Sequence, residues 1–250
     1  MAGRGSPPLL PYDYVSRTRD LPVNLLFLLP WVLVYELALF GTRSRMENAA
    51  GAWFRALIAA LGRDGTLLVS VLASLLLLVV VLRRIQEAPA DRGVYGGMLA
   101  EGLCYGALLG LFSSMLAQML PMERIAPLAN PAPEGLYRAR LALQDFALAI
   151  GAGIFEELAF RGILCAGLYL LLRHAVGAGR FVAGPVAILI SAYLFSDYHH
   201  WGVFGEPENA AVFAFRFHAG ILLGTIFLTR GLGIAAFAHG FYHVLVMLRT

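Results

Sequence analysis

The chain has 250 residues, of which 59% are hydrophobic and 14% are charged, and its mean hydropathy is +0.73. This composition excludes a water-soluble globular core, because soluble domains carry about 25% charged residues, and it indicates a membrane protein. All nineteen basic residues are arginine and the formal net charge is only +3, which excludes a nucleic-acid-binding protein with a basic face.

The predicted elements are transmembrane helices, each of which needs roughly 17–25 mostly apolar residues. In chain order the candidates are Asn24–Gly41, Thr66–Leu82, Met98–Leu120, Leu141–Leu172, Val182–Phe195, Ala211–Thr229 and Gly231–Leu248. We count the long run 141–172 as two helices broken near a pair of glutamates. The predicted fold is therefore an all-α, polytopic transmembrane bundle of about eight helices, with a buried polar site in its C-terminal half.

The N-terminal stretch is polar, contains proline and lacks a small-residue cleavage site, so we interpret 24–41 as a retained first span and not as a signal peptide. A proline-rich loop, 121–135, divides the chain into a segment 1–135 with three spans and a helical core 136–250 within one membrane domain. Arginine clusters flank both ends of the second span, so the positive-inside rule gives no orientation. The core segment holds all six histidines.

Polar residues of the core segment follow helical spacing. In GIFEELAFRGIL, Glu157 and Arg161 are four residues apart and share a helix face, with the glutamate in the favourable N-terminal position. Glu156 is rotated by about 100° from Glu157 and has no such local partner. His199 ends another span, and His239 and His243 lie four apart in the last span.

The free-energy cost of placing these polar groups within membrane helices indicates that they have a function. A charged side chain at the centre of a membrane helix costs roughly 2.5–3.5 kcal/mol, so intramembrane charges are kept where they act. The alternative is structural: Glu157 and Arg161 form an ion pair, and the histidines hydrogen-bond between helices. Arg216 is close enough to the start of its span to reach the interface, and we leave it and His218 outside the predicted site.

Three short motifs resemble those of one family. EELAFRG is similar to an EExxxR signature, FSDYH to FxxxH, and HGFYH to most of HxxxN/D, in the order found in the CAAX-protease and bacteriocin-processing family of glutamic intramembrane proteases. The resemblance covers roughly residues 140–250 and implies a membrane-embedded hydrolase. It implies no cofactor and no metal. The implied partners are the lipid bilayer and a membrane-associated or lipid-linked protein substrate, with no nucleic acid.

The resemblance also implies a role for each of the six site residues in peptide hydrolysis. Glu156 and His199 would activate a water, His239 and His243 would stabilise the oxyanion, and Arg161 would hold Glu157 and stiffen the helix. The family usually has Asn or Asp where this chain has His243. A neutral histidine can still donate one hydrogen bond, so His243 either donates to the oxyanion or orients His239.

The residues alone are also compatible with two other classes of function. Glu156, His199, His239 and His243 offer the ligand types of a zinc metalloprotease, although HExxH is absent. Glutamate and histidine chains also form proton relays in transporters, and a non-catalytic scaffold could keep the motifs. The lysine-free composition is typical of a GC-rich bacterial genome, and with the spans it indicates a multi-pass protein of a bacterial inner membrane.

Overall fold

The structure is a computed structural model that describes residues 11–42, 92–119, 136–201 and 209–248, with positions 79, 83 and 207. Every regular element in these ranges is helical and none is a strand, which confirms the predicted all-helical fold. The elements are α1 (Pro11–Thr18), α2 (Leu21–Thr42), α5 (Arg92–Met119), α6 (Leu136–Glu157), the π-helix η1 (Leu158–Cys165), α7 (Ala166–His174), α8 (Arg180–Asp197), the 3₁₀-helix η2 (Tyr198–His200), α9 (Ala210–Arg230) and α10 (Leu232–Met247).

Most predicted spans coincide with described helices. Within the described ranges, three helices are long and apolar enough to cross a membrane, at Arg92–Phe112, Arg180–His200 and Ala210–Arg230. Two shorter apolar helices cover Leu21–Tyr35 and Leu232–Met247. The predicted span 66–82 and the proline-rich loop 121–135 lie outside the described residues.

A π-helix replaces the break that we predicted in the run 141–172. Helix α6 continues directly into η1 and then into α7. At the end of η1 the N–H of Ala166 donates to the carbonyl of Arg161, five residues earlier, as the wider π turn requires. The backbone therefore accommodates the charged residues without leaving the helical path, and only the register of the side chains changes.

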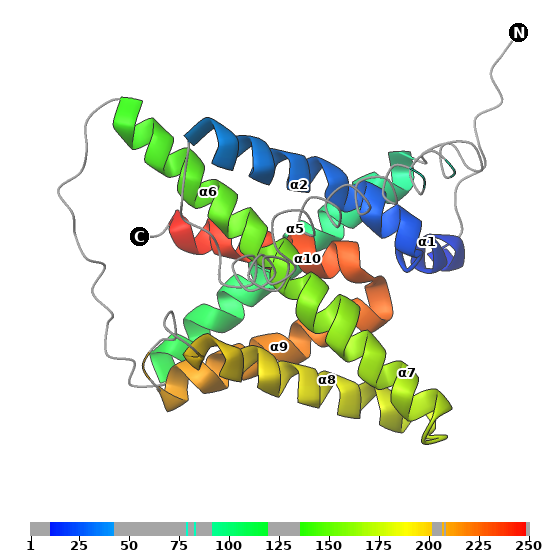
Figure 1. Cartoon of the computed structure of the whole chain (residues 1–250). Coiled ribbons are helices and arrows are strands. Elements are labelled where there is room, and N and C mark those ends of the chain that lie inside the picture. The colour runs from blue at the N-terminus through cyan, green and yellow to red at the C-terminus, as the bar shows by residue number, and fades with distance from the viewer. Residues whose placement is uncertain are drawn as a thin grey trace, which may run out of the picture.

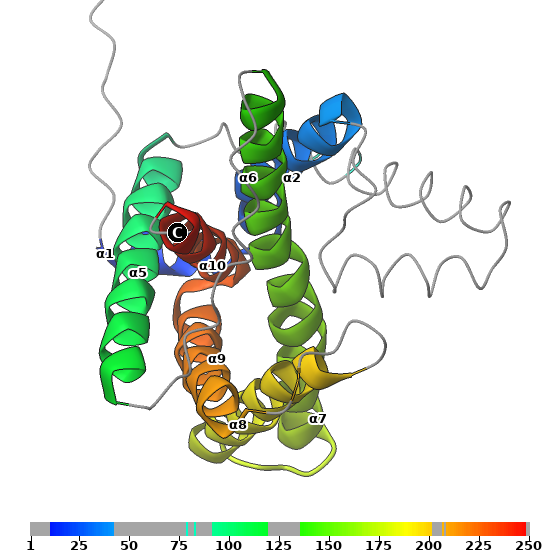
Figure 2. The same ribbon diagram turned by 90° about the vertical axis from the view of Figure 1, so that its left-hand side faces the viewer.

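Helix α10 lies between α5 and α6 at the centre of the bundle, and α2 also packs against it (Figures 1 and 2). The backbones of α6 and α10 touch, because a Cβ on Gly153 would lie 2.3 Å from the amide nitrogen of Gly240. On the other side of α10, a Cβ on Gly106 of α5 would lie 2.7 Å from the carbonyl oxygen of Ala238. Small residues thus let three helices approach closely, as in other membrane bundles.

The first turn of α10 is capped by a side chain from α2. Gly231 precedes α10 with a φ of 99° and has no side chain that could cap the helix. Instead, the N–H of Gly233 donates to Oδ1 of Asn24, which is 2% exposed. The Asn24 amide in turn donates to the carbonyls of Thr18 at 3.0 Å and Asp20 at 2.7 Å. Asn24 therefore satisfies a helix-terminal amide that would otherwise be buried without an acceptor.

A charged contact joins α1, α5 and α9 near the same end of α10. Arg230 Nε donates to Glu101 Oε2 at 2.7 Å, and Arg230 Nη2 pairs with Glu101 Oε1. The guanidinium also lies over the ring of Tyr14, 5.2 Å from its centre. Burial, followed by the nearby Glu101 carboxylate, raises the pKa of Tyr14 to about 12. The phenol thus stays neutral beneath the cation, and the contact is an ion pair with a stacked ring.

We predict that Asn24→Leu lowers the free energy of unfolding by about 1–3 kcal/mol, because it leaves the Gly233 amide buried without an acceptor. The measurement is thermal unfolding of the purified chain in detergent. Thr225→Val is the matched control, since the exposed Thr225 hydroxyl donates to the Ile221 carbonyl of its own helix. An Asn24→Leu protein that unfolds at the wild-type temperature would contradict the capping role.

Candidate active site

The charged residues of the first motif lie at the junction of α6 and η1. Glu156 and Glu157 are the last two residues of α6, and Arg161 follows in η1. These residues are 5%, 0% and 0% exposed, so all three lie in the interior of the bundle. Helices often change to π geometry at functional sites, and here the change coincides with the charged motif.

Arg161 is held by three helices besides its own. Its Nη1 donates to Glu157 Oε1 at 2.6 Å, and its Nη2 donates to the Gly220 carbonyl of α9 at 3.2 Å. The guanidinium carbon also lies 4.5 Å from the centre of the Phe195 ring on α8. Hydrogen bonds help a buried ion pair to persist, and these contacts engage Nη1 and Nη2 of Arg161 and one oxygen of Glu157, whereas Arg161 Nε and Glu157 Oε2 have no hydrogen-bond partner among the described residues.

The two histidines of α10 form a chain of hydrogen bonds that ends at the Glu157 carboxylate. His239 Nδ1 lies 2.9 Å from Glu157 Oε1, and a carboxylate oxygen only accepts, so this nitrogen carries the proton. The His239 Nε2 atom therefore holds a lone pair. His243 Nε2 lies 3.0 Å from it and must be the donor. Hydrogen bonds thus run from His243 to His239 to Glu157, and Arg161 donates to the same carboxylate.

Glu156 is bound through only one of its oxygens. Its Oε1 accepts a hydrogen bond from the Tyr198 hydroxyl at 2.7 Å. Its Oε2 is shielded from bulk solvent, has no hydrogen-bond partner among the described residues, and lies 3.9 Å from His239 Nε2. The neighbouring glutamates differ in their donors and their position: two donors bind Oε1 of the fully buried Glu157, whereas Glu156 has one donor and lines a cavity.

Phe195 of α8 positions His199 in η2, the 3₁₀-helix that follows α8 directly. The His199 Nδ1 atom lies 2.8 Å from the Phe195 carbonyl and must donate to it, so the His199 Nε2 atom carries a lone pair. The Phe195 ring also contacts the ring of His199 edge-on at 5.2 Å and that of His239 at 5.8 Å. One aromatic residue thus contacts both histidine-bearing helices and the guanidinium of Arg161.

A cavity of about 240 Å³ joins these groups. Four of the six predicted site residues line it: Glu156, His199, His239 and His243. Glu157 and Arg161 lie behind this surface, fully buried. The remaining lining comes mostly from apolar side chains of α5, α9 and α10, together with one cation, Arg216 of α9.

The segment that holds the cavity residues was compared with known proteins. Residues 138–245 match the family model described as type II CAAX prenyl endopeptidase, Rce1-like. This Rce1-like segment is thus similar to that family over less than half of the chain. Neither the curated proteins nor the solved structures gave a match. The family is described by an endopeptidase activity, and the matched range contains all six predicted site residues.

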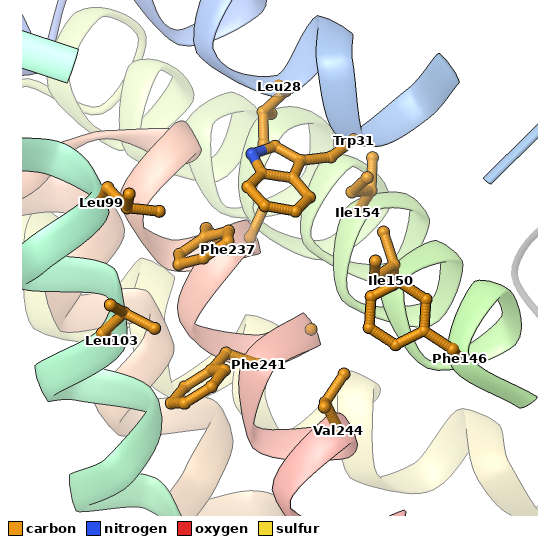
Figure 3. A pocket seen from close by; sticks show the side chains of 12 residues that line it. Leu28, Trp31, Leu99, Leu103, Phe146, Ile150, Ile154, Phe237, Phe241 and Val244 are labelled. Atoms are coloured by element: carbon orange, nitrogen blue, oxygen red, sulfur yellow. The ribbon is translucent and has the colours of Figure 1, made fainter. Parts of the chain in front are cut away.

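The Rce1-like segment also borders a second, apolar cavity of about 290 Å³, on the other side of α10 (Figure 3). Phe146, Ile150 and Ile154 of α6 face it, as do Phe237 and Phe241 of α10 (Figure 3). The α10 residues at 236, 237, 240, 241 and 244 line this apolar cavity, whereas those at 239, 242, 243 and 246 line the polar one. Helical periodicity thus makes α10 the wall between the two.

Three groups of this Rce1-like site could bind a metal ion. Ligand atoms of Glu156, His239 and His243 all lie within 4.8 Å of one another. Zinc–nitrogen bonds of about 2.0–2.1 Å place tetrahedral donors roughly 3.3 Å apart, and the pairs here lie 3.0 and 3.9 Å apart. The His239 hydrogen bond to Glu157 is also typical of zinc-binding histidines. His199, which the zinc hypothesis included, is not part of this cluster.

Two residues of the site were not predicted from the sequence. Tyr198 lies inside the FSDYH motif, directly before His199, but nothing in its spacing indicated a hydrogen bond to Glu156. Arg216 gave a signal, because an arginine within an apolar span is unusual, but we expected it to reach the interface and left it outside the predicted site. The structure instead places it on the wall of the cavity.

We predict that Arg161→Ala lowers the free energy of unfolding by about 3–5 kcal/mol, because the Glu157 charge stays buried after its partner is removed. The matched control is Arg230→Ala. The Arg230–Glu101 pair is 13% and 28% exposed, so solvent compensates the remaining charge and we expect a loss of about 1 kcal/mol. Unfolding of both variants by denaturant in mixed micelles gives the comparison. Equal losses would show that the buried network does not carry the stability assigned to it.

Proposed function

We propose that this chain is an intramembrane endopeptidase of the glutamic type, which hydrolyses a peptide bond of a membrane-associated or lipid-linked protein. One observation carries the proposal: Glu156 presents an unpartnered carboxylate oxygen beside a cavity that His199, His239 and His243 also line. The family supports protease activity. We further propose that the protein is multi-pass in a bacterial inner membrane, with segment 1–135 supporting the core 136–250.

Glu156 would act as the general base. Its Oε2 accepts a proton from a water, and the resulting hydroxide adds to the carbonyl carbon of the scissile bond. The hydrogen bond from Tyr198 fixes the other oxygen, so Oε2 is the atom that exchanges the proton. When the tetrahedral intermediate collapses, the carbon–nitrogen bond breaks and Glu156 returns the proton to the leaving amine. The lone pair on His199 Nε2 accepts a hydrogen bond from the same water.

His243 would stabilise the oxyanion by changing its hydrogen-bond partner. In the present arrangement its N–H is directed at His239 Nε2, and the His239 N–H at Glu157. Neither neutral ring can therefore donate into the cavity without rearrangement. We propose that His243 transfers its hydrogen bond from His239 to the developing oxyanion, which is the stronger acceptor because it is charged.

We predict that Glu156→Gln lowers the rate of peptide hydrolysis by about 100- to 10,000-fold, the usual contribution of a general base, and leaves the fold intact. The glutamine amide can still accept from Tyr198 but cannot take a proton. The assay uses the purified chain in nanodiscs and a quenched fluorogenic peptide with an S-farnesyl cysteine followed by three apolar residues. Glu101→Gln, remote from the cavity, should stay within about threefold of wild type. Full activity of Glu156→Gln would exclude the base role.

A zinc protease is the second candidate, favoured by the cluster of Glu156, His239 and His243. His243 variants separate the two mechanisms. If His243 donates to the oxyanion, we predict that His243→Asn keeps the rate within about tenfold, whereas His243→Ala lowers it by about 100-fold or more. Chelators should then have no effect. Equal, severe losses in both variants, with activity that a chelator removes and zinc restores, would replace the glutamic mechanism with a metal-dependent one.

A further inference from the structure

The apolar cavity on the far side of α10 has no part in the proposed hydrolysis. Its volume is about 290 Å³, and none of the residues that line it also lines the polar cavity. Ile150 and Ile154 of α6 and Ala236 of α10 are buried and form its floor. Leu99 and Leu103 of α5 also line it but are exposed (Figure 3). The cavity is therefore closed by α6 and α10 and accessible along α5.

A second apolar hollow adjoins this cavity between α2 and α5. It has a volume of about 530 Å³ and shares Trp31 of α2 and Leu99 of α5 with the first. Pro30 and Gly96, which also line it, are exposed. An apolar path thus runs from the outside of the bundle, between α2 and α5, to the face of α10.

The depth of the cavity determines which molecules surround it. Leu28, which lines the cavity, is the middle residue of the apolar helix Leu21–Tyr35. Leu103 lies one residue from the middle of the span Arg92–Phe112. The hydrocarbon core of a bilayer is about 30 Å thick, so its middle lies roughly 15 Å from the headgroups on either side. The space outside the two helices that border the entrance therefore contains the chains of lipids.

A hydrocarbon chain matches the walls of the cavity. Every lining residue is aliphatic or aromatic, apart from Gly240. Such a cavity does not hold water, because it offers no hydrogen-bond partners, and an apolar cavity of about 150 Å³ binds benzene. Twice that volume accommodates a chain segment of roughly ten carbon atoms. An empty cavity would deprive the rings of Phe237 and Phe241 of dispersion contacts that a bound chain supplies.

We propose that this cavity is a binding site for one hydrocarbon chain of a bilayer phospholipid. The chain enters between α2 and α5 and packs against the face of α10 opposite to His239 and His243. A lipid linked to a substrate is a different molecule: a helix with its side chains is about 10–12 Å across, so a lipid attached beside a bond held at Glu156 would have to pass around α10. The inference goes beyond the proposed peptidase function and does not depend on it.

Trp31 can report on the bound chain, because its indole ring lines the cavity (Figure 3). The chain contains three tryptophans, and phenylalanine at positions 53 and 201 leaves Trp31 as the only emitter. This protein is titrated in detergent with a phospholipid that carries bromine near its chain ends. We expect the fluorescence to fall and to saturate at a single bound lipid. The same phospholipid brominated near its headgroup should quench several-fold less, because bromine quenches only on contact.

Two substitutions test whether the lipid binds in the cavity itself. Val244→Phe on α10 and Leu103→Phe on α5 each add part of a ring to the cavity, and we expect each to weaken the saturable binding by about tenfold or more. Leu103 lies at the exposed edge, so its variant tests the site even where Val244→Phe disturbs the fold. Leu108→Phe is the matched control, since Leu108 is exposed on the same helix and lines neither cavity. It should bind the lipid as the wild type does.

The outcomes separate this site from other occupants and from the peptidase function. Quenching that rises without saturation, or that is equal in Leu108→Phe, Leu103→Phe and Val244→Phe, would overturn the site. Relief of the quenching by a farnesylated peptide, but not by the same peptide without its lipid, would assign the cavity to the substrate and overturn the proposal. Saturable quenching in a protein that hydrolyses no peptide would support the lipid site and count against the proposed function alone.

Discussion

The packing of the C-terminal half depends on how the buried Arg161 guanidinium is satisfied. A charge without any exposed surface must find an opposite charge and hydrogen-bond acceptors within the protein, because neither lipid nor water supplies them. Arg161 finds them on separate helices: Glu157 at the end of α6, Gly220 on α9 and the ring of Phe195 on α8. His239 of α10 completes the set through Glu157. Four helices thereby converge on one ion pair.

The same constraint gives the two neighbouring glutamates different chemistry. Glu157 accepts from Arg161 and from His239, so its charge is fixed in place. Glu156 points in a different direction, where Tyr198 holds one oxygen and the other borders the cavity. A carboxylate held by two donors thus lies directly beside one that lines the cavity. Helix α10 presents one face to this polar site and the opposite face to the apolar cavity, and Figure 3 shows the apolar one.

The sequence by itself determined that the protein is built for a membrane and which segments form its helices. Long apolar runs exclude an aqueous core and favour helices, because only helices satisfy their own backbone within lipid over such lengths. The described helices accordingly follow the predicted spans closely. Spacing of four residues also predicted the Glu157–Arg161 pair and placed His239 and His243 on one helix face, since contacts within a helix depend only on its period. Both pairs are in contact in the structure.

Only the tertiary structure decided which groups meet between helices. The Tyr198–Glu156 bond joins residues 42 positions apart, and the Asn24–Gly233 cap joins residues 209 positions apart. No local period relates such residues, because their approach depends on crossing angles and on the close contacts at Gly106 and Gly153. The position of Arg216 was decided in the same way. Spacing along α9 gives its face on that helix, but whether that face meets lipid or a cavity depends on how the neighbouring helices pack.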